Sequence, residues 1–252
     1  MNLSYEDLIS GDPIFVRDVG HLKSPQLWQL KPTKGIGMWS YNLYLNILVW
    51  DKSSFLKFIH TSNPRAASKL ENDKLSAFDI VTLLEFTREL LQKALGFFMT
   101  ETLEWDEKSR SFSTKDENGN AIGTINRDNF DDVRSLMLQL NYIGIGESAK
   151  PTKHSSKKAQ ELWERAQKYL KEETTKSPQD KRLALGNIIS KLCAASTSYN
   201  LLNIYDLTVF QLYDQFFQYG YLRAMNLNEM AFSNHGGKDF DMQAWLKPII
   251  KF

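Results

Sequence analysis

Residues 76–98 read Ser-Ala-Phe-Asp-Ile-Val-Thr-Leu-Leu-Glu-Phe-Thr-Arg-Glu-Leu-Leu-Gln-Lys-Ala-Leu-Gly-Phe-Phe, the clearest helical pattern in the chain. Ser76 and Asp79 have the S-x-x-D spacing of a capping box, which satisfies backbone N–H groups where a helix begins. Apolar residues then recur every three or four positions, at Ile80, Leu83, Leu84, Leu91, Ala94, Leu95 and Phe98. We therefore expect one long helix over residues 76–98 that organises the core.

Shorter elements precede this stretch. A capped helical turn over 4–10 ends at Gly11, and the β-prone residues 14–16 predict a short strand. Ser24 followed by Pro25 is typical of a helix N-cap with proline in the first turn, so we expect a helix through Leu30. A further helix follows over 39–50, with an apolar face that includes Trp39, and a short helix begins near residue 51.

After residue 98 the pattern changes from helix to strand. Residues 102–106, 111–114 and 121–125 are β-prone, and Asn118-Gly119 lies between the last two, which is a strong hairpin signal. An amphipathic helix capped by Asn126 or Asp128 is expected from about 127 to 140. Residues 101–140 therefore predict a small β-meander with one helix packed against it.

The C-terminal half predicts only helices. Residues 144–151 have the composition of a linker, 155–174 that of a charged amphipathic helix, and apolar helices follow from residue 183 and over 205–219. The fold class is mainly α with a small antiparallel β-meander (α+β) and no parallel sheet. We divide the chain into a helical region 1–146 with the meander at about 101–125, a basic linker and charged helix 147–182, and an aromatic helical region 183–252.

The composition is that of an ordinary globular protein with many aromatic residues. Its 252 residues include 15 Phe, 10 Tyr and 6 Trp, which indicates either an aromatic core or a surface that contacts other proteins. The net charge of +1 gives no field that would recruit nucleic acid or a membrane. The single Cys193, interpreted as a buried inert thiol, and the lack of a signal peptide or long apolar span favour a cytosolic location, which the phage resemblance described below makes the bacterial host cytoplasm.

No catalytic or metal-binding motif is present. The four histidines lack the spacing of metal ligands, and the G-x-G-x-x-A of Gly144–Ala149 follows a predicted helix rather than a strand. Paired acids at 101 and 104, 131 and 132, and 239 and 241 lie in polar segments that we expect to be exposed. We therefore expect no catalytic residues, no metal, no cofactor and no enzymatic activity.

Charge is segregated along the chain. Residues 150–182 hold ten Lys and Arg against five acids, whereas residues 101–132 hold nine acids against four bases. One interpretation is a basic patch for nucleic acid, with Trp163 and Tyr169 available for stacking. The other is a solvated helix, or one that pairs with the acidic meander. The candidate basic-patch residues are Lys153, Lys157, Lys158, Arg165 and Lys168.

Four stretches resemble a group of Gram-positive phage and prophage proteins, in the same order along the chain. They are Gly-Asp-Pro-Ile-Phe-Val-Arg-Asp-Val-Gly-His-Leu-Lys-Ser-Pro-Gln-Leu at 11–27, Ile-Asn-Arg-Asp-Asn-Phe-Asp at 125–131, Ala-Gln-Glu-Leu-Trp at 159–163 and Asn-Leu-Leu-Asn-Ile-Tyr-Asp-Leu-Thr-Val-Phe-Gln-Leu-Tyr-Asp-Gln-Phe at 200–216. The group belongs with tail and virion-morphogenesis proteins and resembles the tail assembly chaperones that accompany a tape-measure protein. The resemblance implies no catalytic residues.

Three functional hypotheses follow. The resemblance implies a non-enzymatic phage assembly factor that binds a tail component or other virion protein. The alternatives are a structural tail or connector protein retained in the virion, and a nucleic-acid-contacting accessory protein using residues 150–182. Of the possible partners, a second copy of the chain, in a homo-oligomer, stays open, nucleic acid is disfavoured by the net charge, and no hypothesis involves a membrane. The candidate protein-binding residues, for which a core role is the alternative, are Tyr205, Phe210, Tyr213, Phe216, Phe217, Trp245 and Phe252.

Overall fold

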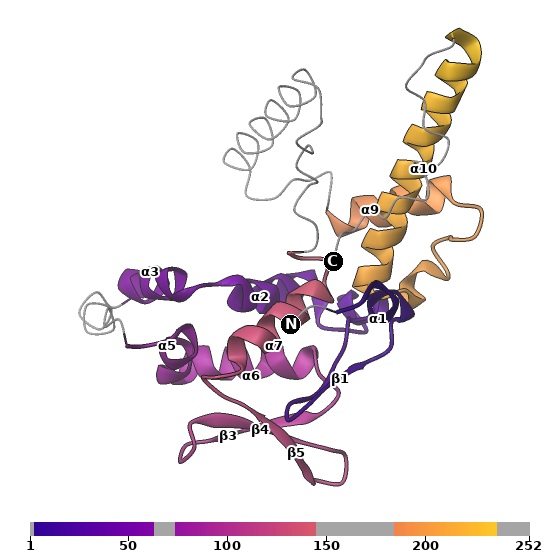
Figure 1. Cartoon of the computed structure of the whole chain (residues 1–252). Helices are drawn as coiled ribbons and strands as arrows, with labels where there is room; N and C mark the ends of the chain where they lie inside the picture. Colours follow the sequence, from indigo (N-terminus) through magenta and orange to yellow (C-terminus); the bar gives the residue numbers. More distant parts are fainter. Residues whose placement is uncertain (1–2, 63–73, 145–183, 236–252) are drawn as a thin grey trace. The chain divides into compact units, whose positions relative to one another are not determined.

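The computed structural model describes residues 3–62, 74–144 and 184–235, which belong to two compact units. Unit 1 contains Met1–Ile143 with Asp206–Phe210, and unit 2 contains Gly144–Tyr205 with Gln211–Phe252. Figure 1 shows the helices and strands along the chain. Helices predominate, and in the described ranges both sheets are antiparallel. The predicted α+β class without a parallel sheet is therefore confirmed.

Unit 1 begins with a short helix and a hairpin. Helix α1 (Tyr5–Ser10) is capped by Ser4, whose side chain accepts from the Asp7 N–H, and it ends at Gly11 with φ 76°. Strands β1 (Ile14–Val16) and β2 (Gly20–Leu22) then pair antiparallel. The predicted first helix and the predicted strand over 14–16 are thus both confirmed.

The helix expected from Ser24 to Leu30 is wrong in its start and type. Only a 3₁₀ helix, η1 (Leu27–Leu30), forms there. Ser24 Oγ accepts from the N–H of Phe210 at 3.2 Å, and Pro25 O accepts from the N–H of Val209 at 2.9 Å. Because these groups bind a segment more than 180 residues later in the chain, they do not form the first turn of a helix.

Four further helices of unit 1 lie between the hairpin and the three-stranded sheet: α2 (Gly37–Val49), α3 (Lys52–Ser62), α5 (Ala77–Leu83) and α6 (Glu85–Phe97). The capping box of Ser76 and Asp79 is present, but the single helix predicted over 76–98 is wrong. It breaks at Leu84, whose φ and ψ of −94° and 129° are extended. Thr87 Oγ1 stabilises the break by donating to Val81 O at 2.6 Å and to Leu84 O at 3.0 Å.

The predicted β-meander is confirmed. Strands β3 (Thr102–Asp106), β4 (Ser111–Lys115) and β5 (Ala121–Ile125) form an antiparallel sheet in the order β3-β4-β5. Gly119, with φ 82°, lies in the predicted hairpin turn between β4 and β5. A glycine is favoured there because side chains rarely adopt positive φ.

The β1–β2 hairpin rests on this sheet. The N–H of Thr124 donates to Asp18 O at 2.9 Å, and Thr114 Oγ1 donates to Val19 O at 2.7 Å. A Cβ on Gly123 would overlap Asp18 O, so the approach of the two backbones requires glycine. The two sheets of unit 1 are therefore joined by direct backbone contact.

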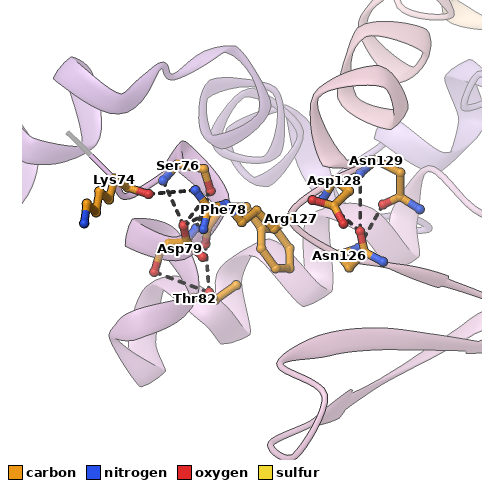
Figure 2. A network of polar contacts seen from close by, with 9 residues as sticks. All are labelled: Lys74, Ser76, Phe78, Asp79, Thr82, Asn126, Arg127, Asp128 and Asn129. Atoms are coloured by element: carbon orange, nitrogen blue, oxygen red, sulfur yellow. Dashed lines mark hydrogen bonds and ion pairs between the residues drawn. The ribbon is translucent and has the colours of Figure 1, made fainter. Parts of the chain in front are cut away.

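Helix α7 (Phe130–Gln139) follows the sheet, near the predicted position. Its cap position is held by Asn129 rather than by Asn126 or Asp128. Figure 2 shows the adjoining polar network, in which Arg127 Nε lies 3.4 Å from Asp79 Oδ2 and its guanidinium donates to Lys74 O. Arg127 thus ties the β5–α7 turn to the N-terminus of α5.

Aromatic rings fill much of the core of unit 1. Phe78 lies 5.2 Å from Phe130 and 6.1 Å from Phe112 between ring centroids, so α5, α7 and β4 meet at these rings. Tyr41 of α2 contacts Phe98 in the same way, at 6.3 Å. Trp39, in contrast, is 77% exposed and lies outside the core, although the pattern placed it on the apolar face of its helix.

Unit 2 is helical in the part that the structure describes. Helix α9 (Leu185–Ala195) agrees with the helix predicted from residue 183. The 3₁₀ helix η3 (Ile204–Asp206) comes next, and α10 (Val209–His235) follows; Asp206 and the first two residues of α10 belong to unit 1. The helix predicted at 205–219 therefore begins four residues later and continues much further.

Candidate protein-interaction surface

Helix α10 is long and carries few charges. It has 27 residues, a length of about 40 Å, and between Val209 and His235 only Asp214, Arg223 and Glu229 are Asp, Glu, Lys or Arg. Its apolar residues do not keep to one face. A helix that is apolar on several sides is normally packed against neighbours on several sides.

The second half of α10 nevertheless exposes large apolar side chains. Leu222, Leu227, Met230 and Phe232 are all exposed in the described structure. Figure 1 shows this half of α10 in the yellow end of the colour range. Exposed apolar side chains that recur along one helix are typical of a surface that binds another protein.

A second group of exposed apolar residues lies in the loop between α9 and η3. Leu201 is 63% exposed and Leu202 is 91% exposed. The loop is held by its own asparagines: Asn200 Oδ1 accepts from the N–H of Leu202 at 2.8 Å, and Asn203 Oδ1 accepts from the N–H of Asn200 at 2.8 Å. The two leucines are therefore presented to solvent from a hydrogen-bonded turn rather than from a loose chain.

We define the exposed apolar set of unit 2 by the residues of these two groups: Leu201, Leu202, Leu222, Leu227, Met230 and Phe232. Sequence reasoning missed all six, because it singled out other residues of the same region, the aromatic ones at 205–217 and in the C-terminal tail. The available signal was the low charge of residues 209–235 together with the length of the helix.

The predicted protein-binding residues have different surroundings. Phe210 is fully buried in unit 1, where its ring lies 5.2 Å from that of Tyr142, so it takes the alternative role in the core. Tyr205, Tyr213, Phe216 and Phe217 are half-buried, and burial raises the pKa of Tyr213. A protein-binding role for these four stays a prediction.

Two groups of predicted residues lie outside the described residues. They are the C-terminal Trp245 and Phe252, and the basic-patch residues Lys153, Lys157, Lys158, Arg165 and Lys168. The predicted charged helix at 155–174 lies there too.

One polar cluster in unit 1 was not expected from the sequence. Glu101, which we predicted to be exposed, is 7% exposed. Its carboxylate accepts from the N–H of His21 at 2.9 and 3.0 Å, and its Oε1 lies 2.7 Å from His21 Nδ1. The prediction failed because the partner, His21, lies 80 residues away in sequence.

The electrostatics of this cluster follow from burial and hydrogen bonding. Burial acts to raise the pKa of Glu101, but hydrogen bonds from the side chain and backbone of His21 outweigh it and leave the pKa below 4.5. Burial lowers the pKa of the nearby Lys23, and the negative charge of Glu101 partly opposes this shift. A Cβ on Gly20 would lie 2.8 Å from Glu101 Cδ, so the close approach also depends on glycine.

The hydrogen bonds of this cluster connect β2 to the residue that precedes β3.

Within the described ranges, no group of three or more His, Cys, Asp or Glu residues is placed to hold a metal ion. Cys193 is only half-buried, not fully buried as predicted, and burial raises its pKa, which favours the thiol over the reactive thiolate. In the same ranges no helix is both long and apolar enough to cross a membrane.

One comparison with known proteins finds a similarity in the C-terminal part of the chain. Residues 175–250 match the family model described as the YomV second domain. Searches of curated proteins and of solved structures return no match. The match includes all six residues of the exposed apolar set and the stretch 200–216, which is similar to Gram-positive phage proteins. This segment of the chain is therefore similar to a phage-related domain.

Proposed function

We propose that the protein is a non-enzymatic phage assembly factor, acting in the bacterial host cytoplasm, that binds a virion protein through the exposed apolar set of unit 2. The observation that carries this proposal is the exposure of all six residues within the segment that matches a phage-related domain. The partner we propose is a tail component, in the manner of a tail assembly chaperone.

The energetics of association support a protein partner. Moving one exposed leucine side chain into an apolar site contributes about 1.5–3 kcal/mol. The asparagine hydrogen bonds around Leu201 and Leu202 reduce the conformational entropy that binding would cost. A partner that offers apolar grooves, as long helical proteins do when they are not yet assembled, would gain from contact with both the loop and α10.

The test uses the tagged full-length chain produced in a bacterium that is infected by the phage of origin. We expect it to co-purify a tail protein, identified by mass spectrometry, and Leu202→Asp or Leu227→Asp to reduce the recovery at least about tenfold. Phe86→Asp, at an exposed apolar residue of unit 1, is the matched control and should leave recovery unchanged. Equal recovery of the tail protein with all three variants would show that the exposed apolar set of unit 2 does not bind it.

A second measurement separates the chaperone from a structural virion protein. An assembly factor should be absent from purified mature virions when their proteins are quantified by mass spectrometry. Stoichiometric amounts in the virions would instead support the structural alternative and overturn the chaperone proposal.

A further inference from the structure

A hollow of about 460 Å³ lies between α6 and β3 in unit 1. It is lined by Glu89, Gln92, Lys93 and Gly96 of α6, and by Thr102 and Leu103 of β3. Its volume falls within the range of ligand-binding pockets, roughly 300–1,000 Å³. The hollow is separate from the exposed apolar set, which belongs to unit 2.

One wall of the hollow is the edge of a sheet. Among the residues that the structure describes, β3 pairs only with β4, so no described strand lies beside its outer edge. Such an edge leaves backbone groups without strand partners, and a further strand can add to it. Gln92 Nε2 donates to Leu103 O at 2.7 Å and so supplies the hydrogen bond that the N–H of an added strand would supply.

The position of Gly96 keeps the space beside this carbonyl open. A Cβ there would have Leu103 Cδ1 at 3.8 Å as its nearest neighbour, which is ordinary contact, so a small side chain is tolerated. A large side chain would project into the space that Gly96 and Leu103 line. A large side chain at Gly96 therefore tests directly whether the hollow binds a ligand.

The charges at the hollow are also available. Glu89 and Lys93 lie four residues apart on α6, a spacing at which opposite charges often pair, yet no ion pair joins them in the described structure. Both side chains are exposed. A peptide that carries both a positive and a negative group can therefore be bound by Glu89 and Lys93 together.

We propose that this hollow binds an extended peptide segment of a partner protein, which lies along the edge of β3. In the complex, a backbone N–H of the peptide takes the place of the Gln92 amide on Leu103 O. A small side chain of the peptide lies against Gly96 and Leu103, while Glu89 and Lys93 bind polar groups on either side.

The experiment selects binders from a library of random 12-residue linear peptides displayed on a filamentous phage, with the full chain as target. Enriched peptides are then synthesised and titrated against the wild type, Gly96→Leu and Gly96→Ala. We expect binding to weaken at least tenfold in Gly96→Leu, which fills the hollow, and to change less than threefold in Gly96→Ala. Circular dichroism establishes that both variants are folded.

Nuclear magnetic resonance of the wild type locates the bound peptide. The side-chain amide of Gln92 should shift on titration, and the peptide should show the large backbone couplings of an extended chain. If Gly96→Leu does not fold, the charge-exchanged pair Glu89→Lys with Lys93→Glu replaces it and should also weaken binding. The proposal is overturned by a selection that enriches nothing, by equal binding to the filled variant, or by peptides that bind as helices.

Discussion

Gly123 is one of the residues at which the β1–β2 hairpin contacts the three-stranded sheet. A Cβ there would overlap Asp18 O, which is backbone and cannot rotate away. We expect Gly123→Ala to lower the free energy of unfolding by about 1–3 kcal/mol, measured by urea denaturation. Gly96→Ala is the control, and it should raise stability by about 0.5–1 kcal/mol because it lies in a helix with room for a methyl group. Equal effects of the two substitutions on stability would contradict the close contact between Gly123 and Asp18 O.

Glu101 makes the stability of unit 1 depend on pH. Its pKa in the folded state lies below 4.5, since the hydrogen bonds from His21 outweigh the effect of burial. The folded state therefore binds fewer protons than the unfolded state as the pH falls, and the stabilisation, complete at neutral pH, is lost as the pH falls through the folded pKa.

Glu101→Gln tests this dependence. The variant should be less stable than the wild type at pH 7, by about 1–1.5 kcal/mol, because a charge-assisted hydrogen bond is replaced by a neutral one. Its stability should fall less steeply than that of the wild type between about pH 5 and pH 3. Urea denaturation across this range measures the free energy of unfolding of both proteins. If the two free energies fall with pH in parallel, Glu101 is not the source of the pH dependence.

At the scale of elements, the break between α5 and α6 depends on one hydroxyl. Thr87 Oγ1 donates to Val81 O and Leu84 O, so Thr87→Val leaves these carbonyls without that donor and should cost about 1–3 kcal/mol. Thr82→Val is the matched control. Thr82 Oγ1 donates to Phe78 O within α5, a bond that duplicates the helical pattern, so its loss should cost less than about 1 kcal/mol. Thermal unfolding of both variants measures the difference.

At the scale of the whole molecule, the exposed apolar set predicts how the free protein behaves. Leu222→Lys combined with Leu227→Glu and Met230→Lys should reduce the fluorescence of a bound hydrophobic dye at least about twofold. The melting temperature should change by only a few degrees, because exposed side chains contribute little to folding. A large loss of stability would mean that these residues are part of a core. Light scattering on the wild type and the triple variant tests whether these exposed side chains also cause self-association.

The sequence by itself determined the elements whose cause is local. The capping box at Ser76, the Asn118-Gly119 turn with its flanking strands, and the helix after residue 129 all follow from residues a few positions apart, whose side chains act on the adjacent backbone. From the sequence we also predicted protein contact in the C-terminal region 183–252, and protein contact there stays a prediction. The residues chosen within it were the aromatic ones, however, since burial cannot be read from composition.

Only the tertiary structure decided the features whose cause is distant in sequence. Ser24 binds the backbone of Phe210 instead of capping a helix, and Glu101 is buried because His21 supplies its hydrogen bonds. In each case a polar group satisfied by a partner outside its own segment overrides the local preference, because a buried group without a partner would cost more than the preference gains.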